Sequence, residues 1–191
     1  MSAFLFLICQ GKTDATECSR FPKDEDLTPR ALNIVQQVRL NVNSTHNIFC
    51  GVQKAAQQTA APFCTTPNID AALSDLNYGE WAGKQLHWVM KHESRDFLAW
   101  LKGAPPPQGE SISDLVRRCD LWLDKHLSLR GNIYAFTSSA VIRGMMMSVI
   151  GTDESAFSKI DVKPFSSTIL SSNNKRWQLC QAVYNSQCNI T

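Results

Sequence analysis

The residues best suited to chemistry follow three apolar segments, at the point where each segment ends. They lie in Cys9–Thr13, Cys50–Lys54 and Thr137–Ala140, and they supply thiols, hydroxyls, a carboxamide and lysines. The first range ends in Gly-Lys-Thr, as a phosphate-binding P-loop does. That motif also needs a glycine five residues before Gly11, so that backbone amides can surround the phosphates, and Phe6 stands there. The sequence therefore argues against a P-loop.

Other nucleophile and metal motifs are also missing from the sequence. A cysteine phosphatase loop needs an arginine six residues after the cysteine, but Ala15 follows Cys9 at that spacing and Asp70 follows Cys64. No Gly-x-Ser-x-Gly elbow is present, and the four histidines form neither His-Glu-x-x-His nor a Cys/His zinc spacing. We therefore expect no metal ion and no cofactor.

Composition narrows the class of protein. The chain has 191 residues, of which 43% are hydrophobic and 19% charged, with a net charge of +2, and this is typical of one globular domain. The charge is too small for a nucleic-acid-binding surface, and the longest apolar run, Ala3–Cys9, is too short to span a bilayer. We expect no signal peptide, no nucleic-acid partner and no membrane partner. Seven scattered cysteines without a Cys-x-x-Cys pair favour a reducing compartment, hence a cytoplasmic protein.

Strand and helix patterns alternate along most of the chain. A polar loop is expected from Gln10 to Leu27, Thr28-Pro29 opens a helix with a capping residue and a proline, and Ser111 caps a long amphipathic helix. The predicted strands are Phe4–Ile8, Asn47–Cys50, Asn132–Thr137, Ser167–Leu170 and Trp177–Val183, and two further helices cover Gln53–Ala61 and Val141–Ile150.

This alternation predicts an α/β fold: a three-layer sandwich with a mostly parallel central sheet and helices on both faces. Residues 1–191 form one domain in this interpretation, and residues 69–109 are a helical insertion over the carboxyl-terminal end of the sheet. Aromatic side chains in the insertion favour a small core of its own over a ligand platform; they are Trp81, Trp88, Phe97 and Trp100. Because sites in such sheets form where strands end, the three ranges named first should meet there.

Six short motifs in this order resemble the histidine phosphatase superfamily, in its phosphoglycerate mutase-like and α-ribazole phosphatase-like branch. The resemblance covers roughly residues 3 to 183. The motifs are Cys9-Gln-Gly-Lys-Thr13, Leu27-Thr-Pro29, Cys50-Gly-Val-Gln-Lys-Ala-Ala-Gln-Gln-Thr-Ala60, Asp75-Leu-Asn-Tyr-Gly-Glu-Trp-Ala-Gly83, Gly109-Glu-Ser111 and Thr137-Ser-Ser-Ala-Val-Ile-Arg143. The resemblance implies a phosphoglycerate mutase-like fold and a phosphate-binding active site.

The chain departs from the family pattern at its chemical centre. The family opens its site with Arg-His-Gly-x-Thr, in which the histidine attacks phosphorus; here those two positions hold Cys9 and Gln10. The family's second arginine falls on Ala55, and its second histidine falls on Ser138. Its general acid, usually Glu, falls on the shorter Asp75. We call these five residues the site positions.

The departures remove the nucleophile and the positively charged groups that a phosphatase needs. A carboxamide nitrogen is not nucleophilic, so Gln10 cannot form a phosphoenzyme. Each charge-assisted hydrogen bond to the phosphoryl oxygens contributes roughly 1.5–3 kcal/mol, and losing three or four of them removes on the order of 5–10 kcal/mol of anion binding. The neighbouring residues that could still bind a ligand are Lys12, Thr13, Lys54, Glu110 and Ser139.

Each of these residues also has a structural interpretation. Cys9 suits a buried, inert thiol, and Ser138 and Ser139 suit a helix cap. Asp75 suits either an acid or a cap, Glu110 offsets a helix dipole, and the two lysines suit solvent-exposed positions. Lone His87 and His92 do not replace the missing nucleophile.

The sequence favours a catalytically degenerate, non-catalytic binding or regulatory module that takes a small molecule or a protein partner. The alternative is a phosphatase or other hydrolase, a phosphomonoesterase if active, with a reassigned nucleophile around Asp75, Lys12, Lys54 and Ser138. A third hypothesis is a subunit of a larger assembly whose pocket is filled by side chains.

Overall fold

The computed structural model describes residues 3–40, 47–183 and 189–190, and its centre is a six-stranded sheet. Strands β3, β4 and β5 run parallel to β1, whereas β6 is antiparallel to both of its neighbours, β1 and β7. The prediction of a mostly parallel sheet is confirmed. In spatial order the strands are β4 (Asn68–Ile69), β3 (Asn47–Cys50), β5 (Gly131–Thr137), β1 (Ala3–Cys9), β6 (Ser167–Ser172) and β7 (Trp177–Val183).

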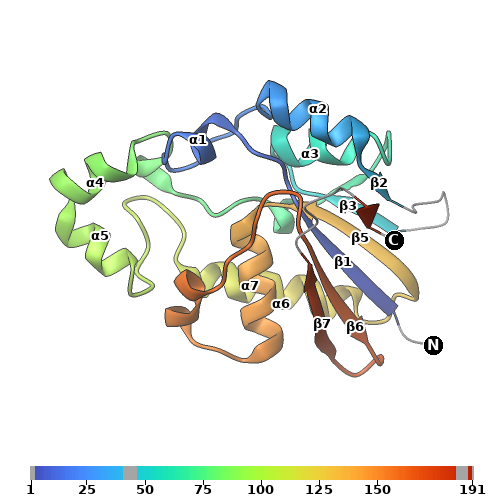
Figure 1. Cartoon of the computed structure of the whole chain (residues 1–191). Helices are drawn as coiled ribbons and strands as arrows, with labels where there is room; N and C mark the ends of the chain where they lie inside the picture. Colours follow the sequence, from blue (N-terminus) through green and yellow to red (C-terminus); the bar gives the residue numbers. More distant parts are fainter. Residues whose placement is uncertain (1–2, 41–46, 184–188, 191) are drawn as a thin grey trace.

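Helices cover both faces of the sheet, as the sequence predicts (Figure 1). On one face lie α6 (Ile112–His126) and α7 (Ser139–Ile150), and on the other lie α3 (Lys54–Ala60) and α2 (Pro29–Gln37). Side chains of β1 alternate between these layers: Leu5 and Leu7 join the core under α6 and α7, and Ile8 joins the smaller core under α3.

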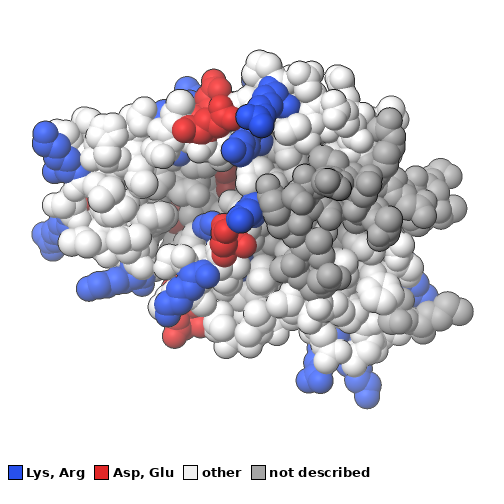
Figure 2. Space-filling model, viewed as in Figure 1, with Lys and Arg blue, Asp and Glu red and all other residues white. Residues whose placement is uncertain are grey.

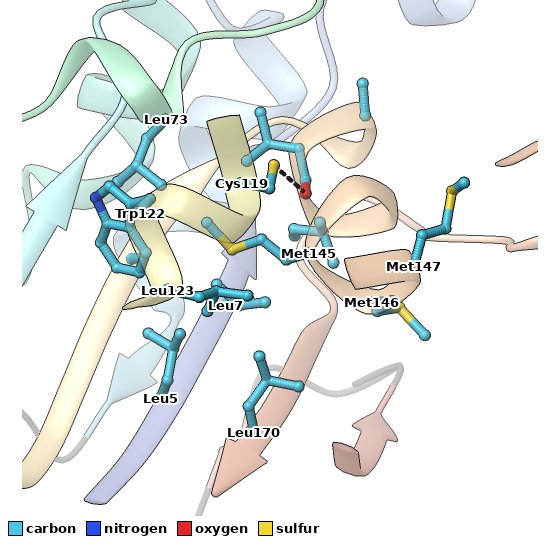
Figure 3. Close-up of a cluster of buried hydrophobic side chains, with 14 of the residues drawn as sticks. Leu5, Leu7, Leu73, Cys119, Trp122, Leu123, Met145, Met146, Met147 and Leu170 are labelled. Carbon is cyan, nitrogen blue, oxygen red and sulfur yellow. Dashed lines mark hydrogen bonds between the residues drawn. The ribbon is translucent and has the colours of Figure 1, made fainter. Parts of the chain in front are cut away.

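The larger core is shown in Figure 3, where leucines of β1 and β6 meet methionines of α7 and aromatic and aliphatic side chains of α6. The thiol of Cys119 on α6 donates a hydrogen bond to the carbonyl of Val141 on α7, with sulfur and oxygen 3.6 Å apart. Gly144 allows this close approach, because a Cβ there would lie 3.0 Å from that sulfur. The core therefore fixes α7, whose first turn follows the end of β5.

Local signals in the sequence set the ends of the main helices. The hydroxyl of Thr28 accepts from the amide of Ala31 at 3.2 Å, and that of Ser111 accepts from Asp114 at 3.0 Å. Gly151 ends α7 in the left-handed conformation, with φ +74°. These three predicted boundaries are confirmed.

Other expectations were wrong in part. The expected loop from Gln10 to Leu27 contains a one-turn helix, α1 (Asp14–Glu17), which is too short to produce a periodic pattern. Further short elements that the sequence did not predict are β2 (Arg39–Leu40) paired with β8 (Asn189–Ile190), β4, and 3-10 helices at Ala71–Leu73, Gly79–Trp81 and Glu154–Lys159.

The segment expected as an insertion holds α4 (Leu86–His92) and α5 (Ser94–Trp100), at the left of Figure 1. Trp81 and Phe97 pack together as expected, and Phe21 from the preceding loop joins them. Trp88 does not belong to this core: it is 40% exposed and stacks on His92. The single domain with an insertion at 69–109 stays a prediction.

Two further sequence expectations concern the cysteines and the apolar segments. The six cysteines that the structure describes are all free, and Cys188 lies outside the described residues, as His46 does. Within the described residues, no helix combines the length and the apolar character that crossing a membrane requires.

Candidate functional site

A pocket of about 230 Å³ opens where β1 and β5 end, at the place that the strand pattern predicts. This open volume argues against the third hypothesis, in which side chains fill the pocket; a role as a subunit of a larger assembly stays a prediction. All five site positions line it, and so do three of the five candidate ligand-binding residues: the pocket brings together Cys9, Gln10, Lys12, Thr13, Ala55, Asp75, Ser138 and Ser139. The remaining two candidates, Lys54 and Glu110, are not among its lining residues.

Backbone hydrogen bonds fix the end of β1. The amide of Cys9 donates to the carbonyl of Ser166 at 3.0 Å, and the amide of Gln10 donates to the carbonyl of Thr137 at 2.8 Å. Gly11 then passes so close to the Phe165 ring that a Cβ would lie 2.4 Å from it. The glycine is therefore required by close packing, next to the Gln10 side chain that lines the pocket.

The carboxamide of Gln10 has no hydrogen-bond partner among the described residues. Its Oε1 is buried, and an unpaired buried acceptor is costly because it has lost water without gaining a donor. The nucleophile position of the family pattern is therefore occupied by a neutral group with unused hydrogen-bonding capacity.

The thiol of Cys9 is buried and unreactive. Its side chain is 2% exposed, and burial, with a smaller contribution from the Asp75 charge, raises the pKa of the thiol to about 12; Arg143 opposes this shift. Cys9 therefore stays a neutral thiol near pH 7, which matches the structural interpretation of this residue rather than a reactive one.

Asp75 and Ser138 line the same pocket and influence each other. Interaction with the Ser138 side chain lowers the pKa of the Asp75 carboxyl, and this carboxyl also accepts from the amide of Leu76 at 2.8 Å. Burial raises the pKa of Asp75, and these two interactions only partly offset the effect. Ser138 is also the cap of α7, since its Oγ accepts from the amide of Val141 at 3.4 Å.

The second arginine position of the family has become part of the hydrophobic core. Ala55 is 1% exposed and packs with Leu27, Ala31 and Val35 between α2 and α3. The adjacent Lys54 is exposed, and its backbone amide donates to Asp24 at 2.9 Å. This agrees with the interpretation of Lys54 as a solvent-exposed residue, and a role of Lys54 in ligand binding stays a prediction.

Glu110 is not among the residues that line the pocket. It forms an ion pair with Arg118, in which Nε and Oε1 are 2.6 Å apart. Arg118 in turn donates to the carbonyls of Ala72, Ser74 and Asp75. This pair holds the segment that carries the acid.

Arg118 was not among the candidate residues, although the sequence carried a signal for it. The residue lies on the same face of α6 as Leu115, Cys119 and Trp122, where a charge is out of place unless it is paired. Further lining residues were not among the candidates: Thr16 lies in the one-turn helix α1, and the others lie outside helices and strands, namely Pro22, Lys23, Glu25, Gln53, Tyr78, Val162 and Pro164.

Charge around the pocket is mixed. Lys12 and Lys23 are exposed lining residues, while Glu25 is paired with Arg20 at 3.0 Å. On the face shown in Figure 2, basic and acidic side chains alternate instead of forming one basic stripe. Among the described residues, no group of three or more His, Cys, Asp or Glu side chains could hold a metal ion.

Comparison with solved structures shows the same fold in several phosphatases. The putative α-ribazole-5′-P phosphatase of Escherichia coli has a TM-score of 0.83 and 19% identity, with 99% of each chain covered. Phosphoserine phosphatase of Entamoeba histolytica has a TM-score of 0.81 and 16% identity, covering 98% of this chain and 100% of that one. The mycobacterial glucosyl-3-phosphoglycerate phosphatase has a TM-score of 0.79 and 16% identity, covering 94% of this chain and 97% of that one.

Sequence comparison agrees with the fold. No curated protein matches the chain in sequence. The family model of the histidine phosphatase superfamily, branch 1, matches residues 5–184, which is nearly the whole chain. The chain with this strand order and this pocket therefore belongs to the histidine phosphatase superfamily.

Proposed function

We propose that this protein is a non-catalytic member of its superfamily, a binding or regulatory module that keeps the pocket of a phosphatase and has lost the reaction. The observation that carries the proposal is Gln10, whose carboxamide lines the pocket at the nucleophile position and has no hydrogen-bond partner among the described residues. A carboxamide cannot accept a phosphoryl group as an imidazole does.

The other site positions support the same proposal. Ala55 is packed in a core, Cys9 holds its proton, and neither supplies the positive charge that phosphoryl transfer requires. Lys12 and Lys23 remain as exposed cations, but lysine lacks the planar fork with which arginine binds phosphate oxygens. The free cysteines further support a cytoplasmic location for the module.

The proposal is tested by steady-state assays of the purified protein. We expect no phosphate release above background from a broad set of phosphomonoesters, and no change in the Gln10→Ala variant. A robust rate that Gln10→Ala abolishes would overturn the proposal.

Restoring the family residues provides a complementary test. The variant with Cys9→Arg, Gln10→His, Ala55→Arg and Ser138→His should bind vanadate more tightly than the wild type in a thermal-shift titration. If this variant folds and binds vanadate no better, the correspondence of these positions to the family site is wrong.

One observation favours a second function, a hydrolase with a reassigned nucleophile. Ser138 lines the pocket together with Asp75, a carboxyl whose pKa burial raises and the Ser138 side chain lowers, and such a pair resembles a nucleophile with a general base. If this pair is active, phosphatase turnover is present in wild type and in Gln10→Ala and is absent in Ser138→Ala.

A further inference from the structure

The carboxamide of Gln10, unpaired among the described residues, is the feature of the pocket that indicates a hydrogen-bonding ligand. Three buried polar side-chain atoms lack a hydrogen bond within the described part of the chain: Gln10 Oε1, Trp100 Nε1 and Arg143 Nε. Of these residues, Gln10 alone lines the pocket. Since a neutral carboxamide can accept at Oε1 and donate from Nε2, a ligand that satisfies it needs a donor and an acceptor close together.

The site positions around Gln10 carry no positive charge. They hold an alanine, a neutral thiol and a serine, together with the carboxyl of Asp75, which would repel a phosphate when ionised. The two lysines that line the pocket, Lys12 and Lys23, are exposed.

The charge of Arg143 lowers the pKa of Cys9, but Arg143 is not a lining residue. Its Cζ atom packs over the Phe157 ring, 5.3 Å from the ring centroid. Charge recognition is therefore weak at the buried end of the pocket.

The rest of the lining matches a ligand that carries hydroxyl groups on a carbon skeleton. Thr13 and Ser139 add hydroxyls, while Val162, Pro164 and the Tyr78 ring add apolar surface for C–H groups. The volume of 230 Å³ is below the roughly 300–1,000 Å³ of sites for drug-sized molecules, so the ligand is small.

We propose that this pocket binds a small uncharged polyol, whose adjacent hydroxyl groups pair with the carboxamide of Gln10. A hydroxyl both donates and accepts, so two neighbouring ones can satisfy Oε1 and Nε2 together. The inference rests on the proposed non-catalytic function and names the ligand class of the same site: the uncharged alcohol instead of its phosphate ester.

Matched pairs of probes test this inference. Saturation-transfer NMR would measure binding of glucose, myo-inositol and ribitol, each against its own monophosphate, to the wild-type protein. We expect signals for the uncharged members and weaker or no signals for the phosphorylated ones. In Gln10→Leu, which keeps the size of the side chain and removes both hydrogen-bonding groups, affinity for the uncharged members should fall about tenfold or more.

Two variants serve as controls. Gln178→Leu makes the same change at an exposed residue of β7 outside the pocket lining and should leave binding unchanged. Gln10→Asn retracts the same carboxamide by one methylene and should weaken binding even if Gln10→Leu fails to fold.

The outcomes separate the two proposals. Phosphorylated probes that bind more tightly than their alcohols, or the absence of any Gln10-dependent signal from the three alcohols, would overturn the polyol inference. Release of phosphate from the same phosphorylated probes would instead overturn the non-catalytic function.

Discussion

Asp75 and Ser138, the capping residue of α7, line the same pocket, and interaction with the Ser138 side chain lowers the pKa of the Asp75 carboxyl against the stronger effect of burial. Both residues occupy positions where the family pattern has catalytic groups. Here the serine influences the charge of the acid, which burial keeps closer to its neutral form. The relationship also makes the charge state of Asp75 a factor in the stability of the fold.

The stability of the protein should depend on pH through Asp75. Burial raises the pKa of Asp75 above the value in the unfolded chain. At pH values between these two pKa values, the folded state binds more protons than the unfolded state, so the free energy of unfolding falls as pH rises. Asp75→Asn should remove this decline, and urea unfolding of both proteins at a series of pH values from about 4 to 8 measures it. Asp96→Asn, on the exposed surface of α5, controls for a general charge effect; an unchanged pH slope in Asp75→Asn would contradict the prediction.

Arg118→Met should destabilise the protein by about 2–4 kcal/mol, because Glu110 and three backbone carbonyls lose their donor in a partly buried place. Arg117→Met is the matched control on the same helix: its side chain is 75% exposed, and its ion pair with Asp114 contributes less than about 1 kcal/mol. Equal midpoints of urea unfolding for the two variants would show that the Glu110–Arg118 pair does not support the segment that carries Asp75.

Gly11→Ala should cost about 1–3 kcal/mol, since the added methyl group would clash with the Phe165 ring. Phe165→Ala should remove most of that cost, so a double-mutant cycle from thermal or urea unfolding should give a large coupling free energy. Additive effects of the two substitutions would mean that another contact requires the glycine.

Cysteine labelling should follow burial. Iodoacetamide at pH 7.5, followed by peptide mass spectrometry, should modify the exposed Cys18 and Cys180 first and leave Cys9, Cys50 and Cys119 unmodified in the native protein. The pKa of each of these three buried thiols is raised to about 12 by burial, so almost none is present as the reactive thiolate. Rapid modification of Cys9 in the folded protein would contradict this and point to a reactive site.

The positions of the family's site could be recognised in the sequence, together with the residues that differ there from the family pattern. Cys9, Gln10, Ala55, Asp75 and Ser138 were all placed at one site from six short motifs, and the structure brings all five to the same pocket. The strand and helix order was also readable, because buried strands are continuous apolar runs and the main helices have caps such as Thr28 and Ser111.

Pairing between distant residues could not be predicted from the sequence. Two interpretations of Lys54 and of Glu110 stood side by side; the structure exposes Lys54 and pairs Glu110 with Arg118, and neither residue is among those that line the pocket. A side chain's direction depends on the rotation of its helix and on partners far along the chain, which local patterns do not encode.

By itself, the sequence determined the layers of the fold and the neutral residue types at the chemical centre, because periodicity and residue identity are local properties. Tertiary structure alone decided that the Gln10 carboxamide oxygen finds no donor among the described residues, that the Ser138 side chain acts on the pKa of Asp75, and that Ala55 is packed into a core. The physical reason is that burial and hydrogen-bond pairing arise where segments distant in sequence meet, so they exist only once the chain has folded.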